Sequence, residues 1–166
     1  MKIYLNSNDA LNNSNPEPFE GKILSLENLQ GFIHAASMQH KQPIIIFGAN
    51  WCPDARLLDR TLQLPTIKKF LDDRCQILNI DVGQYELNIN LLQWFDPAIE
   101  SGIPRVFILN LDGETLNLDC NEKMRTARDQ SSQEIFNYFQ DFILPAWLVA
   151  KVLNFISTLP NISHGF

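Results

Sequence analysis

The sequence predicts an α/β protein in which one mixed β-sheet is flanked by helices. Two short, largely apolar runs, Ile44–Phe47 and Cys75–Val82, have the length and the flanking breaks of buried strands. A helical pattern lies between them, and this order implies a right-handed crossover with parallel pairing. Further along, Asp112-Gly113 between apolar segments indicates a hairpin, and therefore an antiparallel pair.

The chain divides by composition into a leader, one domain and a short tail. Residues 1–21 hold five Asn between positions 6 and 15, followed by Pro16 and Pro18, and have little to bury. We therefore expect a flexible or loosely docked leader. Residues 22–157 form the expected domain, which is long enough for a proper core, and 158–166 form the expected tail.

The first helix of the domain is predicted to follow Ser25. Ser is a favoured N-cap residue, and Pro43 prevents the helix from continuing into the next element. Between them, apolar residues recur at helical spacing, at Leu26, Leu29, Ile33 and Ala36.

The strand Ile44–Phe47 leads through a Gly-Ala-Asn turn into Trp51-Cys52-Pro53-Asp54-Ala55. Pro53 indicates the first turn of a helix, where its missing N–H would be unpaired in any case. Cys52 is then placed at the helix N-terminus. Free backbone N–H groups and the positive end of the helix dipole favour its thiolate, which is the nucleophilic form of cysteine. This helix is expected to reach about Leu64, and a helical pattern resumes after Pro65.

The second half of the chain supplies two more strands and two more helices. We expect a short helix at Leu87–Phe95, closed by Asp96-Pro97, and a third strand at Ile103–Leu109. The Asp-Gly hairpin predicts a fourth strand at Thr115–Leu118, and the polar residues 119–130 predict a loop.

The C-terminal helix is predicted to open with a capping box, Ser131-Ser132-Gln133-Glu134. Its apolar face carries Ile135, Phe139, Phe142 and Ile143. Pro145 should kink or break the helix, giving a long kinked C-terminal element. The apolar stretch from Phe142 to Ala150 is too short to span a bilayer.

Charge and cysteine content bear on the partner of the protein and on its compartment. A formal net charge of −6, with no cluster of Lys and Arg, argues against a nucleic-acid partner. Only three cysteines are present, Cys52, Cys75 and Cys120, and this odd, low number fits a reducing compartment. We therefore expect a cytoplasmic protein, provided that Met1 does not stand in place of a removed signal peptide.

Taken together, three anchors in order resemble the thioredoxin-like superfamily over about residues 22–157. They are the strand into Trp51-Cys52-Pro53, the strand Leu78-Asn79-Ile80-Asp81, and Gly102-Ile103-Pro104 before an apolar strand that ends in the hairpin. The resemblance implies a thioredoxin-like fold, a cis Ile103–Pro104 bond facing the active-site sulfur, and Cys52 as the catalytic residue. It also implies a substrate groove formed by Trp51, Pro53, Asp54, Ile103 and Pro104.

The chain departs from that family where the second sulfur belongs. Ala55 stands at the resolving position, giving Cys-x-x-Ala, and both a natural loss and an introduced trapping substitution are open. Ile46 and Ile77 stand where the best-known thioredoxins carry a buried carboxylate and a Lys. Arg105 follows the proline in place of a small hydroxyl residue.

Three functions fit these residues. The first is thiol–disulfide exchange, in which Cys52 forms a mixed disulfide with a protein or small-molecule partner. An external thiol, or else Cys75 or Cys120, then resolves it, although both cysteines are more readily read as structural. The second is a redox-inactive binding module on the same scaffold. The third, a peroxide- or glutathione-linked enzyme with one sulfur, fits least because Thr and Arg do not surround Cys52. We expect no cofactor and no metal, since only one Cys lies near the site. The oligomeric state is not predicted.

Overall fold

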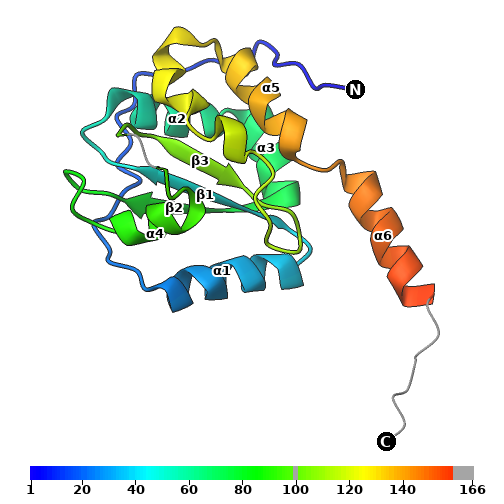
Figure 1. Ribbon diagram of the computed structural model, residues 1–166. Helices are drawn as coiled ribbons and strands as arrows, with labels where there is room; N and C mark the ends of the chain where they lie inside the picture. Colours follow the sequence, from blue (N-terminus) through cyan, green and yellow to red (C-terminus); the bar gives the residue numbers. More distant parts are fainter. Residues whose placement is uncertain (99–100, 159–166) are drawn as a thin grey trace, which may run out of the picture.

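The computed structural model describes residues 1–98 and 101–158 (Figure 1). The helices and strands are α1 (Leu26–Met38), β1 (Gln42–Gly48), α2 (Pro53–Leu62), α3 (Pro65–Arg74), β2 (Cys75–Asp81), α4 (Ile89–Phe95), β3 (Arg105–Ile108), η1 (Leu118–Cys120), η2 (Lys123–Asp129), α5 (Ser132–Phe142) and α6 (Ala146–Thr158). They follow one another in the predicted order as far as β3, and differ from it between β3 and α5.

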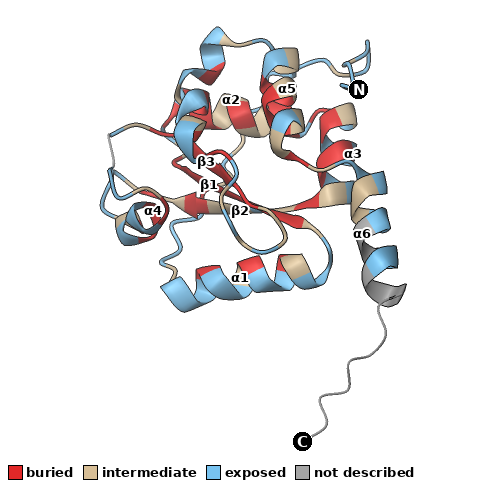
Figure 2. Cartoon of the chain, turned by 45° about the vertical axis from the view of Figure 1, so that its right-hand side comes forward, coloured by how far each residue is buried: buried red, intermediate tan, exposed pale blue. Residues whose placement is uncertain are grey.

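The sheet is mixed, and β1 is its central strand. Among the described residues the strand order is β2-β1-β3, with β2 parallel and β3 antiparallel to β1. All seven residues of β1 are buried, as expected for a strand with neighbours on both edges and helices on both faces. Helices α1 and α4 lie on one side of the sheet, and α2, α3 and α5 lie on the other (Figures 1 and 2).

Both predicted helix starts are confirmed. Ser25 caps α1, and its hydroxyl accepts a hydrogen bond from the backbone N–H of Asn28. Ser131 caps α5 with the full capping box, because the Glu134 carboxylate in turn accepts from the backbone N–H of Ser131. These caps satisfy N–H groups that a helix end otherwise leaves unpaired.

The predicted fourth strand, Thr115–Leu118, is wrong. Apart from one isolated bridge between Leu109 and Thr115, this segment forms no ladder with β3. The buried side chain of Asn117 takes the place of a strand. Its Oδ1 accepts from the Ile108 N–H at 2.8 Å, and its Nδ2 donates to the Val106 carbonyl at 2.8 Å. The edge of β3 is thus paired by an amide side chain.

The predicted loop 119–130 is also wrong, since it contains the 3-10 segments η1 and η2. Segment η2 packs against α2 and buries Met124 and Ala127. Because 3-10 segments are short, polar composition alone gave no periodic signal for them.

The leader, expected to be flexible or loosely docked, lies against the domain at several points in this structure. The Asp9 carboxylate accepts hydrogen bonds from the backbone N–H of Thr66 at 2.8 Å and from its hydroxyl at 2.7 Å. At its other end, Phe19 is buried, and its N–H and carbonyl are both bonded to the Asn50 side chain. A Cβ at Gly48 would lie 2.3 Å from the Phe19 ring, so the ring occupies space that only glycine leaves open.

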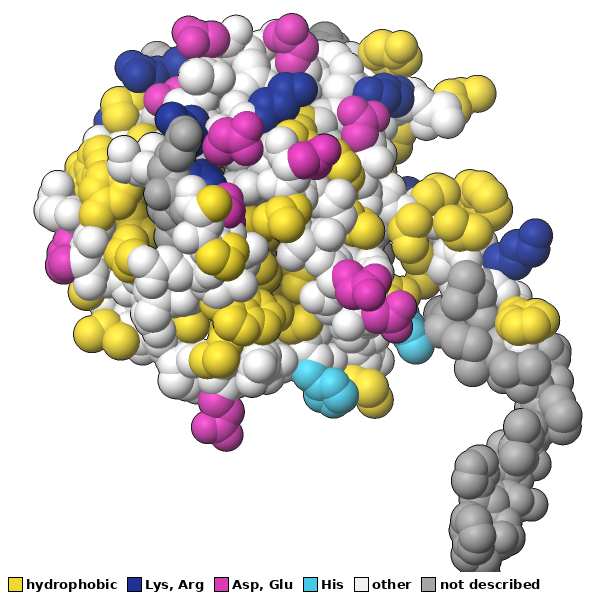
Figure 3. Space-filling view, in the orientation of Figure 1, with side chains coloured by type: hydrophobic (Ala, Val, Ile, Leu, Met, Phe, Trp, Pro, Cys, Tyr) yellow, Lys and Arg dark blue, Asp and Glu magenta, His cyan; other side chains and the backbone are white. Residues whose placement is uncertain are grey.

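At the C-terminal end, the predicted break at Pro145 separates α5 from α6. Helix α6 extends away from the body of the molecule and carries exposed hydrophobic side chains, including Trp147 and Phe155 (Figures 1 and 3). Of the expected tail, residues 159–166 lie outside the described residues. None of the helices in the described ranges combines the length and the apolar character that crossing a bilayer requires.

Candidate functional site

Cys52 lies where the central strand passes into a helix. Strand β1 ends at Gly48, and the following turn is closed by a hydrogen bond from the Cys52 N–H to the Ala49 carbonyl at 3.0 Å. Cys52 is the N-cap residue of α2, with Pro53 in the first turn behind it. The side chain is 5% exposed. The sequence therefore predicted its position at the head of a helix correctly.

The Ile103–Pro104 segment lies directly opposite the sulfur. Its peptide bond is cis, the isomer that the resemblance implies. The thiol of Cys52 donates to the Ile103 carbonyl oxygen, with an Sγ-to-oxygen distance of 3.6 Å. Strand β3 begins at the next residue, and Arg105 pairs with Phe47 near the end of β1. Antiparallel pairing with β1 thus brings the start of β3 to the same sheet end as Cys52.

An aromatic pair forms one rim of the site. Trp51 is 44% exposed, and its indole N–H donates to the Gly83 carbonyl at 2.7 Å. Its ring meets the Tyr85 ring edge-on, with centroids 5.9 Å apart. Partial burial, together with the negative charge of a Cys52 thiolate, raises the pKa of the Tyr85 phenol, while Arg125 acts in the opposite direction. Tyr85 therefore lies within electrostatic range of both groups.

The carboxylate of Asp54, which was expected in the substrate groove, is bonded to another segment of the fold. Its Oδ1 accepts from the backbone N–H of Arg128 at 2.9 Å and from that residue's Nε at 3.2 Å. Asp54 is 8% exposed, whereas the Arg128 side chain reaches solvent. The carboxylate next to Cys52 thus fastens η2 to the first turn of α2.

The same η2 segment brings Arg125 to the proline loop. Gly102 has a φ of +127°, and a Cβ built on it would lie 2.5 Å from Arg125 Nε and 2.9 Å from Cζ. The guanidinium therefore lies directly over Gly102, which precedes Ile103. Arg125 itself is half-buried.

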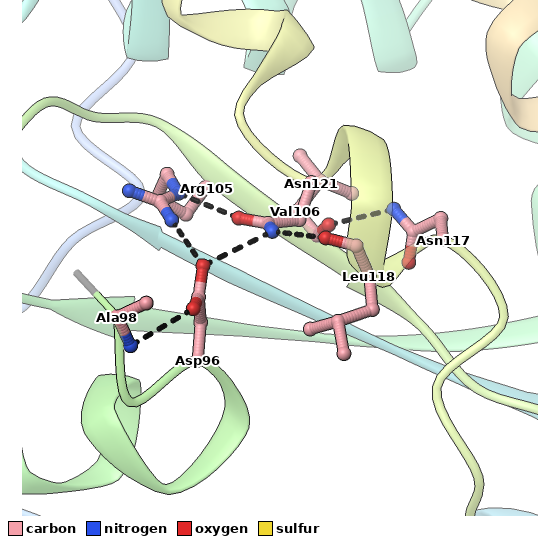
Figure 4. Close-up of polar contacts among 7 residues, drawn as sticks. All are labelled: Asp96, Ala98, Arg105, Val106, Asn117, Leu118 and Asn121. Atoms are coloured by element: carbon pink, nitrogen blue, oxygen red, sulfur yellow. Dashed lines mark hydrogen bonds and ion pairs between the residues drawn. The ribbon is translucent and has the colours of Figure 1, made fainter. Parts of the chain in front are cut away.

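A buried polar cluster holds the other side of the proline loop (Figure 4). Arg105, which follows Pro104, is 3% exposed. One of its guanidinium nitrogens lies 2.7 Å from an Asp96 carboxylate oxygen, and its Nε donates to the Asn121 side chain at 2.6 Å. Since Asp96 is the C-cap of α4 and Asn121 follows η1, this arginine joins three segments behind the site. The large side chain of Arg105 thus has a structural role in this fold.

Ala55, which the resemblance places at the resolving position, is 2% exposed in the first turn of α2. Ile46 is buried beneath the site in β1, whereas Ile77 lies on the edge strand β2 and is 36% exposed. No carboxylate–lysine pair occupies these two positions.

The other two cysteines, Cys75 and Cys120, both have thiol pKa values above the ordinary value. Cys75 pairs with Gln42 at the start of β1, so it lies at the opposite end of the sheet from Cys52. Burial raises the pKa of the Cys75 thiol to about 12. The pKa of Cys120 is also raised, by burial and by neighbouring acidic residues. In the described part of the chain, no three His, Cys, Asp or Glu side chains come together as a metal centre would require.

These features define a thioredoxin-like fold: a strand, a cysteine at the head of a helix, and a cis-proline loop opposite the sulfur. No protein-family model matches the chain, and no curated protein matches it. Among solved structures, the chain is similar to the disulphide isomerase from Xylella fastidiosa Temecula1, with 28% identity, a TM-score of 0.68, and coverage of 77% of this chain and 98% of that one. It also matches the C-terminal domain of Neisseria meningitidis DsbD in the oxidised form, with 24% identity, a TM-score of 0.45, and coverage of 56% and 80%.

Sequence reasoning missed Tyr85 and Arg125 as members of the site, and it named Gly102 only as part of the anchor before the proline. Tyr85 and Arg125 come from segments with no periodic pattern, and both reach the site only through tertiary contacts. A signal was present for Gly102, because a glycine just before the Ile-Pro pair indicates close approach of another group.

Proposed function

We propose that the protein carries out thiol–disulfide exchange, with Cys52 as its single nucleophile. The observation that carries this proposal is the contact between the Cys52 thiol and the Ile103 carbonyl at the cis-proline loop. The similarity to a disulphide isomerase supports the same class of reaction.

The proposed reaction has two steps. In the first, the Cys52 thiolate attacks one sulfur of a partner's disulfide, so that a Cys52–partner disulfide forms and the other partner sulfur leaves as a thiolate. In the second, an external thiolate attacks the partner sulfur of that mixed disulfide, which releases Cys52 and leaves the partner disulfide-bonded to the external thiol. Ala55 supplies no internal thiol, and Cys75 lies at the far end of the sheet.

The site suggests how a partner approaches a sulfur that is nearly buried. Trp51 and Tyr85 form an exposed aromatic rim on one side, and the Ile103–Pro104 loop forms the other. An extended segment lying between them would hydrogen-bond to the backbone of the loop, displacing the Cys52 thiol from the Ile103 carbonyl, while its own sulfur reaches Cys52. Protein disulfides and small-molecule disulfides both suit such a groove.

A redox-inactive binding module is the second candidate. The specific observation in its favour is that the resolving position is filled by a buried alanine, with isoleucines at the two positions that otherwise support proton transfer. In that case the groove would bind extended segments without covalent exchange.

Two measurements on the intact chain separate these candidates. Native alkylation with iodoacetamide at pH 7, read by peptide mass spectrometry, should modify Cys52 before Cys75 and Cys120, whose pKa values are raised. Reduction of insulin or of a small disulfide by excess external thiol should then be accelerated by the protein and lost in Cys52→Ser. Faster alkylation of Cys75 or Cys120, or catalysis unchanged in Cys52→Ser, would overturn the proposal. No turnover, but binding of a peptide that Cys52→Ser retains, would favour the module.

A further inference from the structure

We infer that Arg125 is a specificity-determining residue, which selects disulfides carrying a carboxylate close to the S–S bond. This inference rests on the proposed exchange reaction at Cys52 and names the chemical class of its substrate. A positive charge at the mouth of the site would attract such groups and orient them towards the sulfur.

The placement of Arg125 follows from contacts in the fold. Its guanidinium covers Gly102, where a Cβ would come within 2.5 Å of Nε. Gly102 adjoins Ile103, whose carbonyl oxygen is 3.6 Å from the Cys52 sulfur. The guanidinium therefore contacts the residue just before Ile103, in the loop that a substrate must contact.

The position of Arg125 is also fixed by the anchoring of its own segment, η2. Arg128, three residues further along η2, is bonded to Asp54 through both its backbone N–H and its Nε. Met124 and Ala127 of the same segment are fully buried. Arg125 thus projects from an anchored segment, and the position of its charge is set before a substrate arrives.

Electrostatic evidence agrees with this geometry. Burial and the Cys52 charge raise the pKa of Tyr85, and Arg125 offsets part of that effect, so the three groups share one electrostatic environment. Segment η2 carries three basic residues, Lys123, Arg125 and Arg128, of which Arg128 is paired with the Asp54 carboxylate.

The test compares the rates at which the reduced protein reacts with three disulfides of different charge. 3,3′-Dithiodipropionate is anionic and carries its carboxylates close to the S–S bond, 2-hydroxyethyl disulfide is neutral and cystamine is cationic. Modification of Cys52 is followed by mass spectrometry, with Cys52→Ser as background. In Arg125→Gln we expect the rate of reaction with the anionic disulfide to fall roughly 3- to 10-fold relative to the rate with the neutral one. A fall of this size corresponds to the loss of one partly screened charge–charge attraction acting over several ångströms. The cationic rate should rise relative to the neutral one.

Two further variants test whether the charge preference depends on the charge at position 125 and on no other position of η2. Arg125→Lys retains the charge and should keep at least half of the preference. Lys123→Gln removes one charge from the same segment at an exposed position and should leave the preference within twofold. An equal fall for all three disulfides in Arg125→Gln, or the same loss of preference in Lys123→Gln, overturns the inference while the proposed exchange stands. If wild-type Cys52 reacts with none of the disulfides, the proposed function itself fails.

Discussion

The carboxylate of Asp54 and the backbone N–H of Arg128 form a 2.9 Å hydrogen bond between residues 74 positions apart. This bond joins the first turn of α2, where Cys52 lies, to segment η2, which carries Arg125. The acidic residue two positions after Cys52 therefore serves the architecture of the candidate site.

From this contact we expect Asp54→Ala to lower the free energy of unfolding by about 1–3 kcal/mol, because it leaves a half-buried N–H of η2 without its acceptor. Asp54→Asn keeps an acceptor oxygen and should cost less. Urea denaturation of both variants at pH 7 measures the difference. Equal stability of Asp54→Ala and the wild type would show that η2 does not depend on this bond.

The ion pair behind the proline loop gives a second prediction. Asp96→Ala should destabilise the protein by about 3 kcal/mol, because it removes the carboxylate that lies 2.7 Å from the buried Arg105 guanidinium. The double variant Arg105→Met with Asp96→Ala should recover part of this loss, since no buried charge is then left without that partner. Thermal and urea denaturation provide the measurement. A double variant less stable than the sum of its single changes would contradict this account.

Stability at alkaline pH should reveal the buried thiol of Cys75. Its pKa is raised from an ordinary value of 9.0 to about 12, so between these values the unfolded chain has lost a proton that the folded chain retains. The stabilisation is complete below pH 9 and declines as the pH rises towards 12, with a slope of up to about 1.4 kcal/mol per pH unit.

The measurement is a series of urea denaturations from pH 8 to pH 11. Cys75→Val should flatten the alkaline decline, because the titrating group is gone. Ile77→Val, on the same strand, removes a methylene but no titrating group, so it should shift stability equally at every pH. An unchanged slope in Cys75→Val would mean that other groups, such as Tyr138 with its raised pKa, account for the decline.

Adding a second thiol next to Cys52 should change the lifetime of the mixed disulfide and the turnover rate. Ala55→Cys places a sulfur three residues after Cys52 in the same helical turn. Under the proposed function, this variant should shorten the lifetime of the mixed disulfide and raise turnover in insulin reduction, because an internal thiol now resolves it. Added volume at a position only 2% exposed should cost about 1–3 kcal/mol of stability.

Ala55→Ser is the matched control for this gain, since it adds an atom at the same position but no thiol. Quenched-flow trapping followed by mass spectrometry reports the lifetime of the mixed disulfide. A gain of equal size in both variants would show that resolution by the added sulfur is not the cause.

Much of the fold was predictable because its signals are local. Ser131 and Glu134 form their capping box within four consecutive residues, and Pro53 marks the start of α2 without help from any distant segment. The predicted fourth strand failed for the opposite reason. The Asp112-Gly113 turn is present, but Asn117, with its amide turned into the edge of β3, offers the backbone there a different set of hydrogen bonds.

The candidate site also has some features that depend on neighbouring residues and others that depend on tertiary packing. The sequence by itself determined that a cysteine would head a helix directly after a buried strand, because each step of that arrangement depends on neighbouring residues. Only the tertiary structure decided that Asp54 is bonded to Arg128, that Tyr85 pairs with Trp51, and that Arg125 covers Gly102. These contacts join segments about 20 to 75 residues apart, and they depend on how the whole chain packs, which no local pattern of residues encodes.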